Sequence, residues 1–261
     1  MLSLSLSDRT ALVTGGSRGI GAAIVRMFVM AGARVVFNYQ HAQAEAAALV
    51  RECGEDRCLA VAADLSTPQA AGALVHRAAA QLGRLDILVA NHGIWPPDDV
   101  PVDAMADEQW HRTVAVNLDS VFGLVKHAVA EMRRHPPHFG SDVRGRIVLV
   151  SSTAGQRGEA FHCDYAAAKG AIISMSKGLS TELARDRIYV NCVAPGWVHT
   201  DMSVPVLEDR ALEARVLGTI PLGRVGTPDE IAAPVLFLCT DHASFITGEV
   251  FNVNGGAVLA G

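Results

Sequence analysis

A tyrosine and a lysine stand four residues apart in the segment Tyr-Ala-Ala-Ala-Lys, which spans Tyr165–Lys169. Residues at this spacing share one face of a helix, so Lys169 can stand beside Tyr165. A free tyrosine titrates near pH ~10, whereas a neighbouring ammonium stabilises the phenolate and lowers its pKa. The spacing therefore predicts a phenol that transfers protons as an acid and base. An exposed helix pair of no function is the alternative.

Three further polar residues suit the same chemistry. Ser151 and Ser152 follow the predicted strand 146–150, at the edge where a parallel sheet binds ligands. A hydroxyl group there either hydrogen-bonds a substrate oxygen and stabilises the charge developing on it, or caps the next helix. Asn117 lies inside a predicted helical stretch, although asparagine is a poor helix former. It is either functional or an ordinary exposed residue.

The elements that must position these residues are short β-branched runs that alternate with alanine-rich helical segments. The predicted strands cover residues 11–14, 34–39, 59–62, 86–90, 146–150, 188–193 and 249–253. The helices between the first four strands cover residues 20–31, 43–53 and 68–82. Apolar strands joined by right-handed helical crossovers predict an α/β fold, a Rossmann-type doubly wound seven-stranded parallel sheet with helices on both faces. Residues 1–261 then form a single domain.

Two stretches break the alternation. Residues 135–145 contain proline and glycine and are predicted to form a surface loop. Residues 197–226 directly follow the end of a strand, where a substrate lid would lie. Their side chains predict a mainly apolar pocket or else internal packing of the lid, and the candidates are Trp197, His199, Met202 and Val206, together with Trp95 and Phe161.

A glycine-rich turn leads from the first strand into the first helix. It reads Thr-Gly-Gly-Ser-Arg-Gly-Ile-Gly over Thr14–Gly21. Glycines let a pyrophosphate approach the backbone closely, and the helix N-terminus offers it free N–H groups. The Gly-x-x-x-Gly-x-Gly spacing is one residue longer than the usual dinucleotide fingerprint. It predicts dinucleotide binding, with a tight turn as the alternative.

The chain resembles the short-chain dehydrogenase/reductase family, whose cofactor turn reads Thr-Gly-x-x-x-Gly-x-Gly. The resemblance extends to the segment Asn252–Gly256. It implies an oxidoreductase that moves a hydride between a nicotinamide dinucleotide and an alcohol–carbonyl pair. It also selects Ser152, thirteen residues before Tyr165, as the catalytic serine. It further implies that Asn117 holds a water linked to Lys169, completing a catalytic set of Asn117, Ser152, Tyr165 and Lys169.

The resemblance also implies the remaining cofactor contacts. Asn91 and Gly93 follow the fourth strand where the family has Asn-Ala-Gly, and His92 replaces the small residue, either facing the cofactor or merely packing. Asp64 either contacts the adenine or belongs to a turn or helix cap. The full predicted set is Gly15, Ser17, Arg18, Gly19, Ile20, Gly21, Tyr39, Gln40, Asp64, Leu65, Asn91, Gly93, Tyr165, Lys169, Pro195, Gly196, Val198 and Thr200.

The end of the second strand bears on the choice of dinucleotide. Enzymes for the unphosphorylated cofactor usually have an acid there to bind the ribose, whereas this strand ends Phe-Asn-Tyr-Gln at Gln40. Arg18 can pair with a 2′-phosphate through its fork of donors. In the family, a basic residue at this place accompanies NADP(H). The sequence therefore favours NADP(H), with NAD(H) left open.

Several substrates and roles remain open. The sequence is similar to 3-oxoacyl-acyl-carrier-protein reductases and to related sugar or polyol dehydrogenases. Arg144, Arg185 and Arg187 are candidates to bind an acidic carrier at the site entrance, although Val143 and Asp186 depart from the family pattern. A small ketone, diketone or sugar is the alternative substrate. A dinucleotide sensor that has lost catalysis is a rival, as is an interaction module built on residues 166–185, but both catalytic side chains are present. The resemblance implies a homotetramer or homodimer.

Charge and cysteine usage exclude other classes. The net charge is -5 and basic residues are scattered, which argues against nucleic acid or anionic membrane as a partner. Met1–Ser7 carry no positive charge or long apolar run, and no stretch approaches ~20 apolar residues. Five widely spaced cysteines predict no disulfide framework, no zinc site and a cytoplasmic location. No metal is expected, because the histidines are dispersed.

Overall fold

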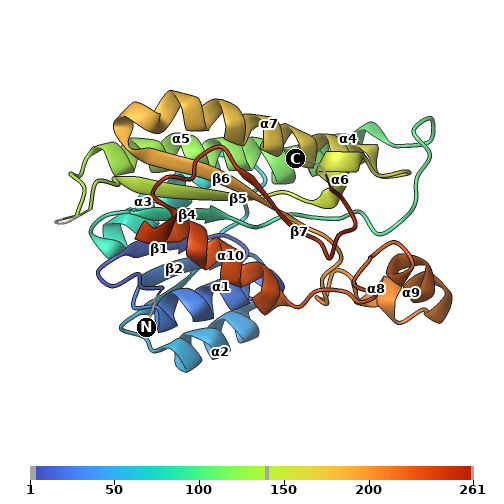
Figure 1. Ribbon diagram of the computed structural model, residues 1–261, viewed down its shortest axis with the longest axis horizontal. Helices are drawn as coiled ribbons and strands as arrows, with labels where there is room; N and C mark the ends of the chain where they lie inside the picture. The colour runs from blue at the N-terminus through green and yellow to red at the C-terminus, as the bar shows by residue number, and fades with distance from the viewer. Residues whose placement is uncertain (1–3, 139–140, 260–261) are drawn as a thin grey trace.

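The computed structural model describes residues 4–138 and 141–259, and these form one parallel sheet between two layers of helices (Figure 1). Seven strands are ordered β3-β2-β1-β4-β5-β6-β7, and every pair of neighbours is parallel. Their bounds are β1 Thr10–Val13, β2 Arg34–Tyr39, β3 Cys58–Ala62, β4 Ile87–Ala90, β5 Gly145–Val150, β6 Ile188–Pro195 and β7 Val250–Val253. The single Rossmann-type domain predicted from the sequence is confirmed. The described residues do not include the two ends of the chain, 1–3 and 260–261, or residues 139–140 of the predicted surface loop.

Two groups of helices cover the two faces of the sheet (Figure 1). One face carries α1 Gly19–Met30, α2 Gln43–Cys53 and α10 Pro228–Cys239. The other carries α3 Pro68–Leu82, α5 Ser120–Arg133 and α7 Cys163–Leu183. Within β1, Ala11 and Val13 pack into the first core cluster and Leu12 into the second. Burial on both faces explains why the strands read as continuous apolar runs.

The bounds of the first three helices agree closely with the prediction. The predicted helices 43–53 and 68–82 match α2 and α3, and α1 begins and ends one residue earlier than predicted. Thr67 caps α3 by accepting from the backbone N–H of Ala70, and Pro68 follows it. Gly83 ends that helix in the left-handed conformation. These are the start and stop signals that a sequence carries locally.

The helix around Asn117 differs from the expectation of a regular helical stretch. The short helix α4 Asp107–Val114 continues into α5 through the π-helical turn η1, Ala115–Asp119. Such turns insert one extra residue and often mark functional sites. Further along the chain, α7 begins at Cys163 rather than near Ala166, and a 3₁₀ turn, Ala184–Asp186, follows it.

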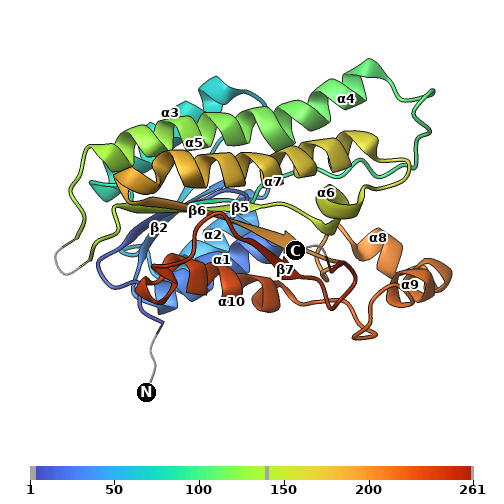
Figure 2. The same cartoon turned by 45° about the horizontal axis from the view of Figure 1, so that its top comes forward.

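The irregular segment 197–226 forms two short helices, α8 Val204–Leu207 and α9 Arg210–Leu217. Figures 1 and 2 show both helices projecting beyond the sheet, away from its main body. Hydrogen bonds join the two ends of the segment 197–226. The backbone N–H of His199 donates to Gly226 O at 2.9 Å, and the backbone N–H of Gly226 donates to Trp197 O at 2.9 Å. The segment lies where a lid was predicted, and its action as a lid stays a prediction.

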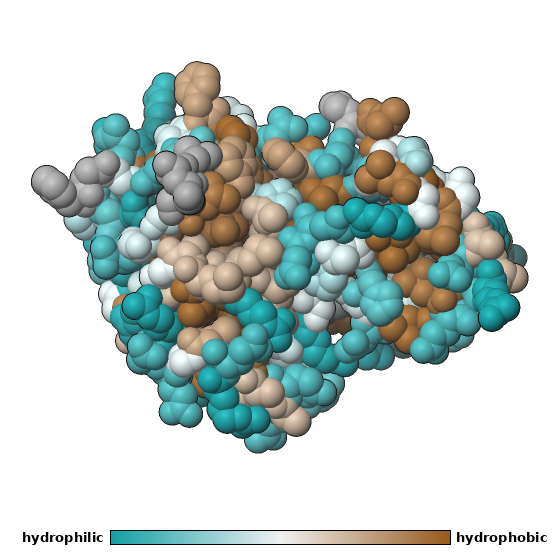
Figure 3. Space-filling model, turned by 60° about the horizontal axis from the view of Figure 1, so that its bottom comes forward, coloured by the Kyte–Doolittle hydropathy of each residue, from teal (hydrophilic) through white to brown (hydrophobic). Residues whose placement is uncertain are grey.

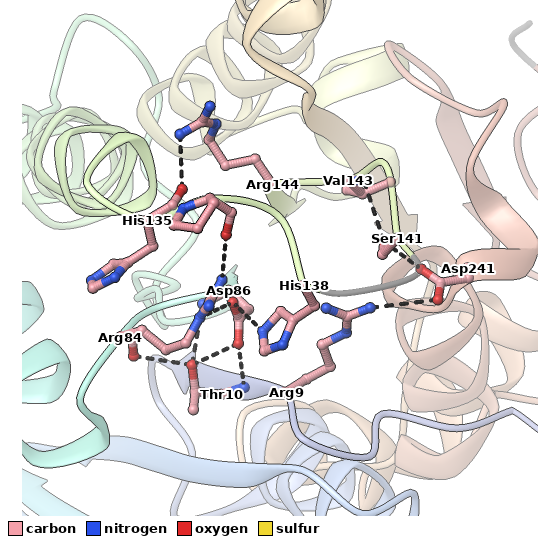
Figure 4. A network of polar contacts seen from close by, with 11 residues as sticks. Arg9, Thr10, Arg84, Asp86, His135, His138, Ser141, Val143, Arg144 and Asp241 are labelled. Atoms are coloured by element: carbon pink, nitrogen blue, oxygen red, sulfur yellow. Dashed lines mark hydrogen bonds and ion pairs between the residues drawn. The ribbon is translucent and has the colours of Figure 1, made fainter.

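The described part of the loop 135–145 is fastened to the amino-terminal edge of the sheet (Figure 4). Buried Asp86 accepts hydrogen bonds from the Thr10 backbone at 2.9 Å and the Arg84 side chain at 2.7 Å, and its Oδ1 lies 3.0 Å from His138 Nε2. Arg144 donates to His135 O at 2.8 Å.

The prediction that the three arginines flank the site entrance is wrong. Arg144 directly precedes β5, and Arg185 and Arg187 precede β6. Residues that precede parallel strands lie at the amino-terminal edge, whereas ligands bind at the carboxyl edge. Arg187 pairs there with Asp142 at 3.1 Å.

No helix among the described residues is long and apolar enough to cross a membrane. The same residues contain no cluster of three or more side chains arranged to hold a metal ion. All five cysteines are free thiols.

Candidate active site

A cleft of about 540 Å³ opens at the carboxyl ends of the strands, and every predicted cofactor residue lines it. Ser152 also lines the cleft, so the glycine turn and the region from Ser152 to Lys169, which are far apart in the sequence, face one space. Asn117 does not reach the surface of the cleft, because it is fully buried behind Gly93.

The glycine turn between β1 and α1 forms one wall of this cleft. Gly15 and Gly19 have φ values of 61° and 51°, in the left-handed region that favours glycine. A Cβ atom on Gly21 would lie 2.0 Å from Gly15 O. No side chain caps the start of α1, and no acidic residue occupies its first turn. The turn therefore offers backbone N–H groups and a positive helix dipole, which fits a diphosphate.

Two asparagines hold the glycine turn in place. Asn38 Oδ1 accepts from the Gly15 backbone N–H at 2.8 Å, and Asn38 Nδ2 donates to Ala63 O at 3.1 Å. Asn91 Nδ2 donates to Thr14 O at 3.0 Å. The sequence analysis considered Asn38 only as part of a strand end that lacks an acid, so its role in holding the glycine turn was missed. A buried polar residue inside an apolar strand was the available signal.

His92 packs into this wall rather than offering a free nitrogen to the cleft. Its Nδ1 lies 2.8 Å from Thr14 Oγ1 and its Nε2 lies 2.7 Å from Ser120 Oγ. Because the Ser120 hydroxyl donates to Val116 O at 2.7 Å, Nε2 carries the proton and Nδ1 accepts. Burial lowers the pKa of His92 to about 3, so the ring stays neutral. His92 therefore packs through both ring nitrogens, and because it also lines the cleft, the alternative that it faces the cofactor stays a prediction.

The end of the cleft where the adenosine is predicted to bind, called the adenosine end below, is more exposed. Arg18 Nη1 donates to Asp201 Oδ2 at 2.8 Å, and both side chains are exposed. Asp64 Oδ1 accepts from the Ser66 backbone at 2.9 Å, which makes Asp64 a turn residue, whereas Thr67 is the cap of α3. The predicted contacts of Arg18 with a phosphate and of Asp64 with adenine stay predictions.

Tyr165 lies on the opposite side of the cleft, near the start of α7, with 8% of its surface exposed. Burial raises the pKa of Tyr165 to about 12; a hydrogen bond with Ser152 lowers it, and the Glu159 carboxylate adds to the rise. The expected lowering by Lys169 is therefore not found. The Lys169 ammonium lies 5.7 Å from the centre of the phenol ring, and desolvation of the phenolate outweighs its attraction. The phenol is protonated at neutral pH.

Lys169 lies one turn along the same helix face, as its spacing predicted. Its Nζ atom donates to Val150 O at 2.9 Å, and only 3% of the residue is exposed. Burial lowers the pKa of Lys169 to about 8, so it still carries its charge at neutral pH. The neighbouring Ser151 donates to Lys169 O at 2.7 Å, which gives Ser151 a structural role.

Ser152 combines the two roles that the sequence left open. It is the N-cap of the short helix α6, Thr153–Arg157, where its Oγ accepts from the Ala154 backbone at 3.1 Å. The same hydroxyl lies near enough to the Tyr165 phenol to lower its pKa. The cap fixes the side chain, so the hydroxyl is held in place beside the phenol.

Asn117 is buried, and the alternative of an ordinary exposed position is wrong. Its Oδ1 accepts from the Ile94 backbone N–H at 2.8 Å and its Nδ2 donates to Ile94 O at 2.9 Å. A Cβ atom on Gly93 would lie 2.9 Å from Asn117 Oδ1 and 3.4 Å from Lys169 Nζ. Glycine at this position therefore lets the amide and the ammonium lie against the same stretch of backbone.

Trp95, a predicted pocket residue, lines the cleft beside the phenol, but the aromatic wall that it forms with His162 was not predicted. The Trp95 ring packs edge-on against Tyr165 with centroids 4.7 Å apart, and the His162 ring lies 4.0 Å from Trp95. His162 Nε2 lies 3.1 Å from Asp99 Oδ1, which ties the wall to the loop after β4. The sequence carries no local signal for contacts between residues that lie so far apart along it.

Comparisons with known proteins agree with this geometry. A family model described as enoyl-(acyl carrier protein) reductase matches residues 15–258. The chain is 37% identical over 254 residues to the 3-oxoacyl-[acyl-carrier-protein] reductase FabG of Chlamydia trachomatis, covering 96% of this chain and 98% of that protein. It is 39% identical to an acetoacetyl-CoA reductase of Rhizobium meliloti, covering 97% of this chain and all of that protein.

Solved structures show the same architecture. The fold matches a short-chain dehydrogenase/reductase described as a glucose/ribitol dehydrogenase, from Brucella melitensis, with a TM-score of 0.88 and 35% identity over 99% of this chain and all of that one. The relatives identify an oxidoreductase that acts on CH–OH groups with a nicotinamide cofactor. The chain belongs to the short-chain dehydrogenase/reductase family.

Proposed function

We propose that the chain is an NADP(H)-dependent carbonyl reductase and secondary alcohol dehydrogenase in which Tyr165 is the acid and base. The observation that carries this proposal is the placement of Tyr165, Ser152 and Lys169 in the same cleft as the glycine turn. A nicotinamide cofactor, when bound, supplies or accepts the hydride. The chain's own residues bind, orient and move the proton.

In the direction of reduction, Tyr165 begins in the protonated form that its raised pKa favours, and it donates that proton to the carbonyl oxygen. Ser152, fixed as a helix cap, donates a hydrogen bond to the same oxygen as negative charge develops on it. The Lys169 ammonium stabilises the phenolate that remains. A water linked to Asn117 and Lys169 would return the proton, and both side chains lie against the backbone at Gly93.

The preference for NADP(H) rests on charge at the adenosine end. Arg18 is exposed in the glycine turn. β2 ends at Tyr39 and is followed by Gln40, so no acid stands there to repel a phosphate. Both Tyr39 and Gln40 line the cleft. NAD(H) is the alternative, because Gln40 brings no second positive charge.

The substrate class that the relatives favour is a 3-oxoacyl thioester, carried by a protein or by coenzyme A. Hydrophobic surface gathers on the right of Figure 3, the side on which Figure 1 places α8 and α9. Met202, Leu212 and Leu222 are exposed in that insertion, which suits an apolar acyl chain. A sugar or polyol is the second candidate, favoured by the glucose/ribitol dehydrogenase of the same fold.

Assembly and location complete the proposal. A homotetramer or homodimer formed through α7 and the C-terminal strand is compatible with catalysis. The five free thiols suit the reducing cytoplasm. A dinucleotide sensor would bind the cofactor without turnover, so an assay of turnover separates an enzyme from a sensor.

The test is a panel of carbonyl and alcohol substrates, including acetoacetyl-CoA, with NADPH and NADP⁺. We expect turnover on at least one pair, and we expect Tyr165→Phe to reduce it by about a thousandfold or more while cofactor affinity stays unchanged. Retained turnover in Tyr165→Phe would show that another group is the acid. Binding without turnover across the panel would favour the sensor.

A further inference from the structure

An ion pair joins the two walls of the cofactor cleft. Arg18 lies in the glycine turn, and Asp201 lies at the start of the insertion that carries α8 and α9. Arg18 Nη1 donates to Asp201 Oδ2 at 2.8 Å. The two residues are 183 positions apart in the sequence, so the contact depends on the tertiary fold.

The backbone on both sides holds this pair in place. The turn and the insertion are in close contact, since a Cβ atom on Gly19 would lie 3.1 Å from Thr200 Cγ2. On the insertion side, buried Ser203 accepts from the Thr200 backbone at 3.0 Å and donates to Val198 O. This tight turn presents the Asp201 carboxylate to Arg18.

The pair changes what an incoming phosphate meets. In the proposed function, Arg18 is the cation that recognises the 2′-phosphate of NADP(H). A carboxylate at 2.8 Å already neutralises that cation. A phosphate that approaches Arg18 must displace this carboxylate or lie beside it, and two anions repel each other.

We propose that Asp201 is a specificity-determining residue for the cofactor, an internal anion that occupies Arg18 until a 2′-phosphate replaces it. This inference rests on the proposed NADP(H) function. A phosphorylated dinucleotide then separates the start of the insertion from the glycine turn. An unphosphorylated dinucleotide leaves the ion pair intact.

The experiment measures Kd for NADPH and for NADH by fluorescence titration in four proteins: wild type, Asp201→Asn, Arg18→Gln and the double variant. We expect Asp201→Asn to tighten NADPH binding by about two- to fivefold at low salt, because both side chains are exposed and such pairs are weak. NADH binding should not change. The gain should shrink as salt screens the pair, and it should be absent in the Arg18→Gln background.

Glu208→Gln is the matched control, since it removes the same charge from an exposed position in the same insertion. The inference is overturned if Asp201→Asn leaves NADPH binding unchanged, tightens NADH equally, weakens both cofactors, or acts no differently from Glu208→Gln. Arg18→Gln separates the two claims. If it weakens NADPH alone, the proposed cofactor preference stands whatever Asp201 does; if it changes neither cofactor, that preference itself fails.

Discussion

The two ends of the cleft hold their charges in opposite ways. At the proposed catalytic end, Lys169 and Tyr165 are buried, and burial shifts the pKa of each toward its neutral form. At the adenosine end, Arg18 and Asp201 are exposed, and they neutralise each other through a direct contact. Substitutions at the buried end should therefore have large effects that salt hardly changes, whereas those at the exposed end should be small and sensitive to salt.

After Tyr165→Phe, Lys169→Met should produce the largest loss of activity at the buried end of the cleft. We expect turnover to fall by about a hundredfold or more, because the phenolate loses its cation. Stability should rise, since keeping the ammonium buried costs roughly 3 kcal/mol at pH 7, partly offset by its bond to Val150 O. Thermal unfolding at pH 7 checks this.

The pH dependence gives the control for Lys169→Met. Above pH 8 the folded wild type releases the Lys169 proton while the unfolded chain still holds it, so wild-type stability rises toward pH 10. The stability gap between the two proteins should close over that range. A variant that is less stable than wild type at pH 7 contradicts the account.

Gly93→Ala should disturb the same end through packing alone. The added Cβ would lie 2.9 Å from Asn117 Oδ1, so the amide or the loop at Ile94 must move. We expect a loss of about 1–3 kcal/mol in unfolding free energy and a lower kcat. Urea denaturation and steady-state kinetics measure both. Unchanged stability and unchanged kcat would mean that the contact between amide and backbone is not needed.

Trp95→Ala should test the buried end of the cleft in another way, because it changes the aromatic wall beside Tyr165 without adding or removing a charge. The indole packs against the phenol and lines the cleft, so its removal opens space beside the carbonyl. We expect kcat/KM for a bulky ketone to rise about tenfold relative to a small one. His162→Gln, which keeps a polar partner for Asp99 but loses the stacked ring, should shift the same ratio less. An unchanged ratio in Trp95→Ala would remove this residue from substrate selection.

Gln40→Arg should have the smallest effect, because it adds one exposed cation near the adenosine end. We expect NADPH to bind up to about fivefold more tightly in low salt, with the gain lost in high salt. Gln40→Glu is the charge-reversed control and should favour NADH. If both variants act equally on the two cofactors, the phosphate does not lie near β2.

The sequence predicted the features that local spacing determines. The interval from Tyr165 to Lys169 and the glycines of the cofactor turn each lie within one short segment, so helix geometry and backbone freedom were enough. The bounds of α3 likewise followed from the helical period of residues 68–82. These features depend only on residues that are close together in the sequence.

The features that were missed depend on contacts between distant segments. The Trp95–His162 stack and the Arg18–Asp201 pair join residues from different elements. The pKa of Tyr165 was expected to fall, because spacing shows the nearby cation but not the depth of burial, which has the larger effect. Asn117 was placed in a regular helix, since no propensity distinguishes a π-helical turn.

Spectrophotometric titration of the tyrosinate in wild type and Tyr165→Phe tests the central claim, that a buried, protonated phenol is the proton donor. The chain has three tyrosines, so subtracting the variant's curve isolates Tyr165. In the protein without cofactor, we predict that the isolated signal stays absent through pH 9 and appears only as the pH approaches about 12. A phenolate already formed between pH 7 and 8 would contradict the claim and show that Lys169, rather than burial, controls this side chain.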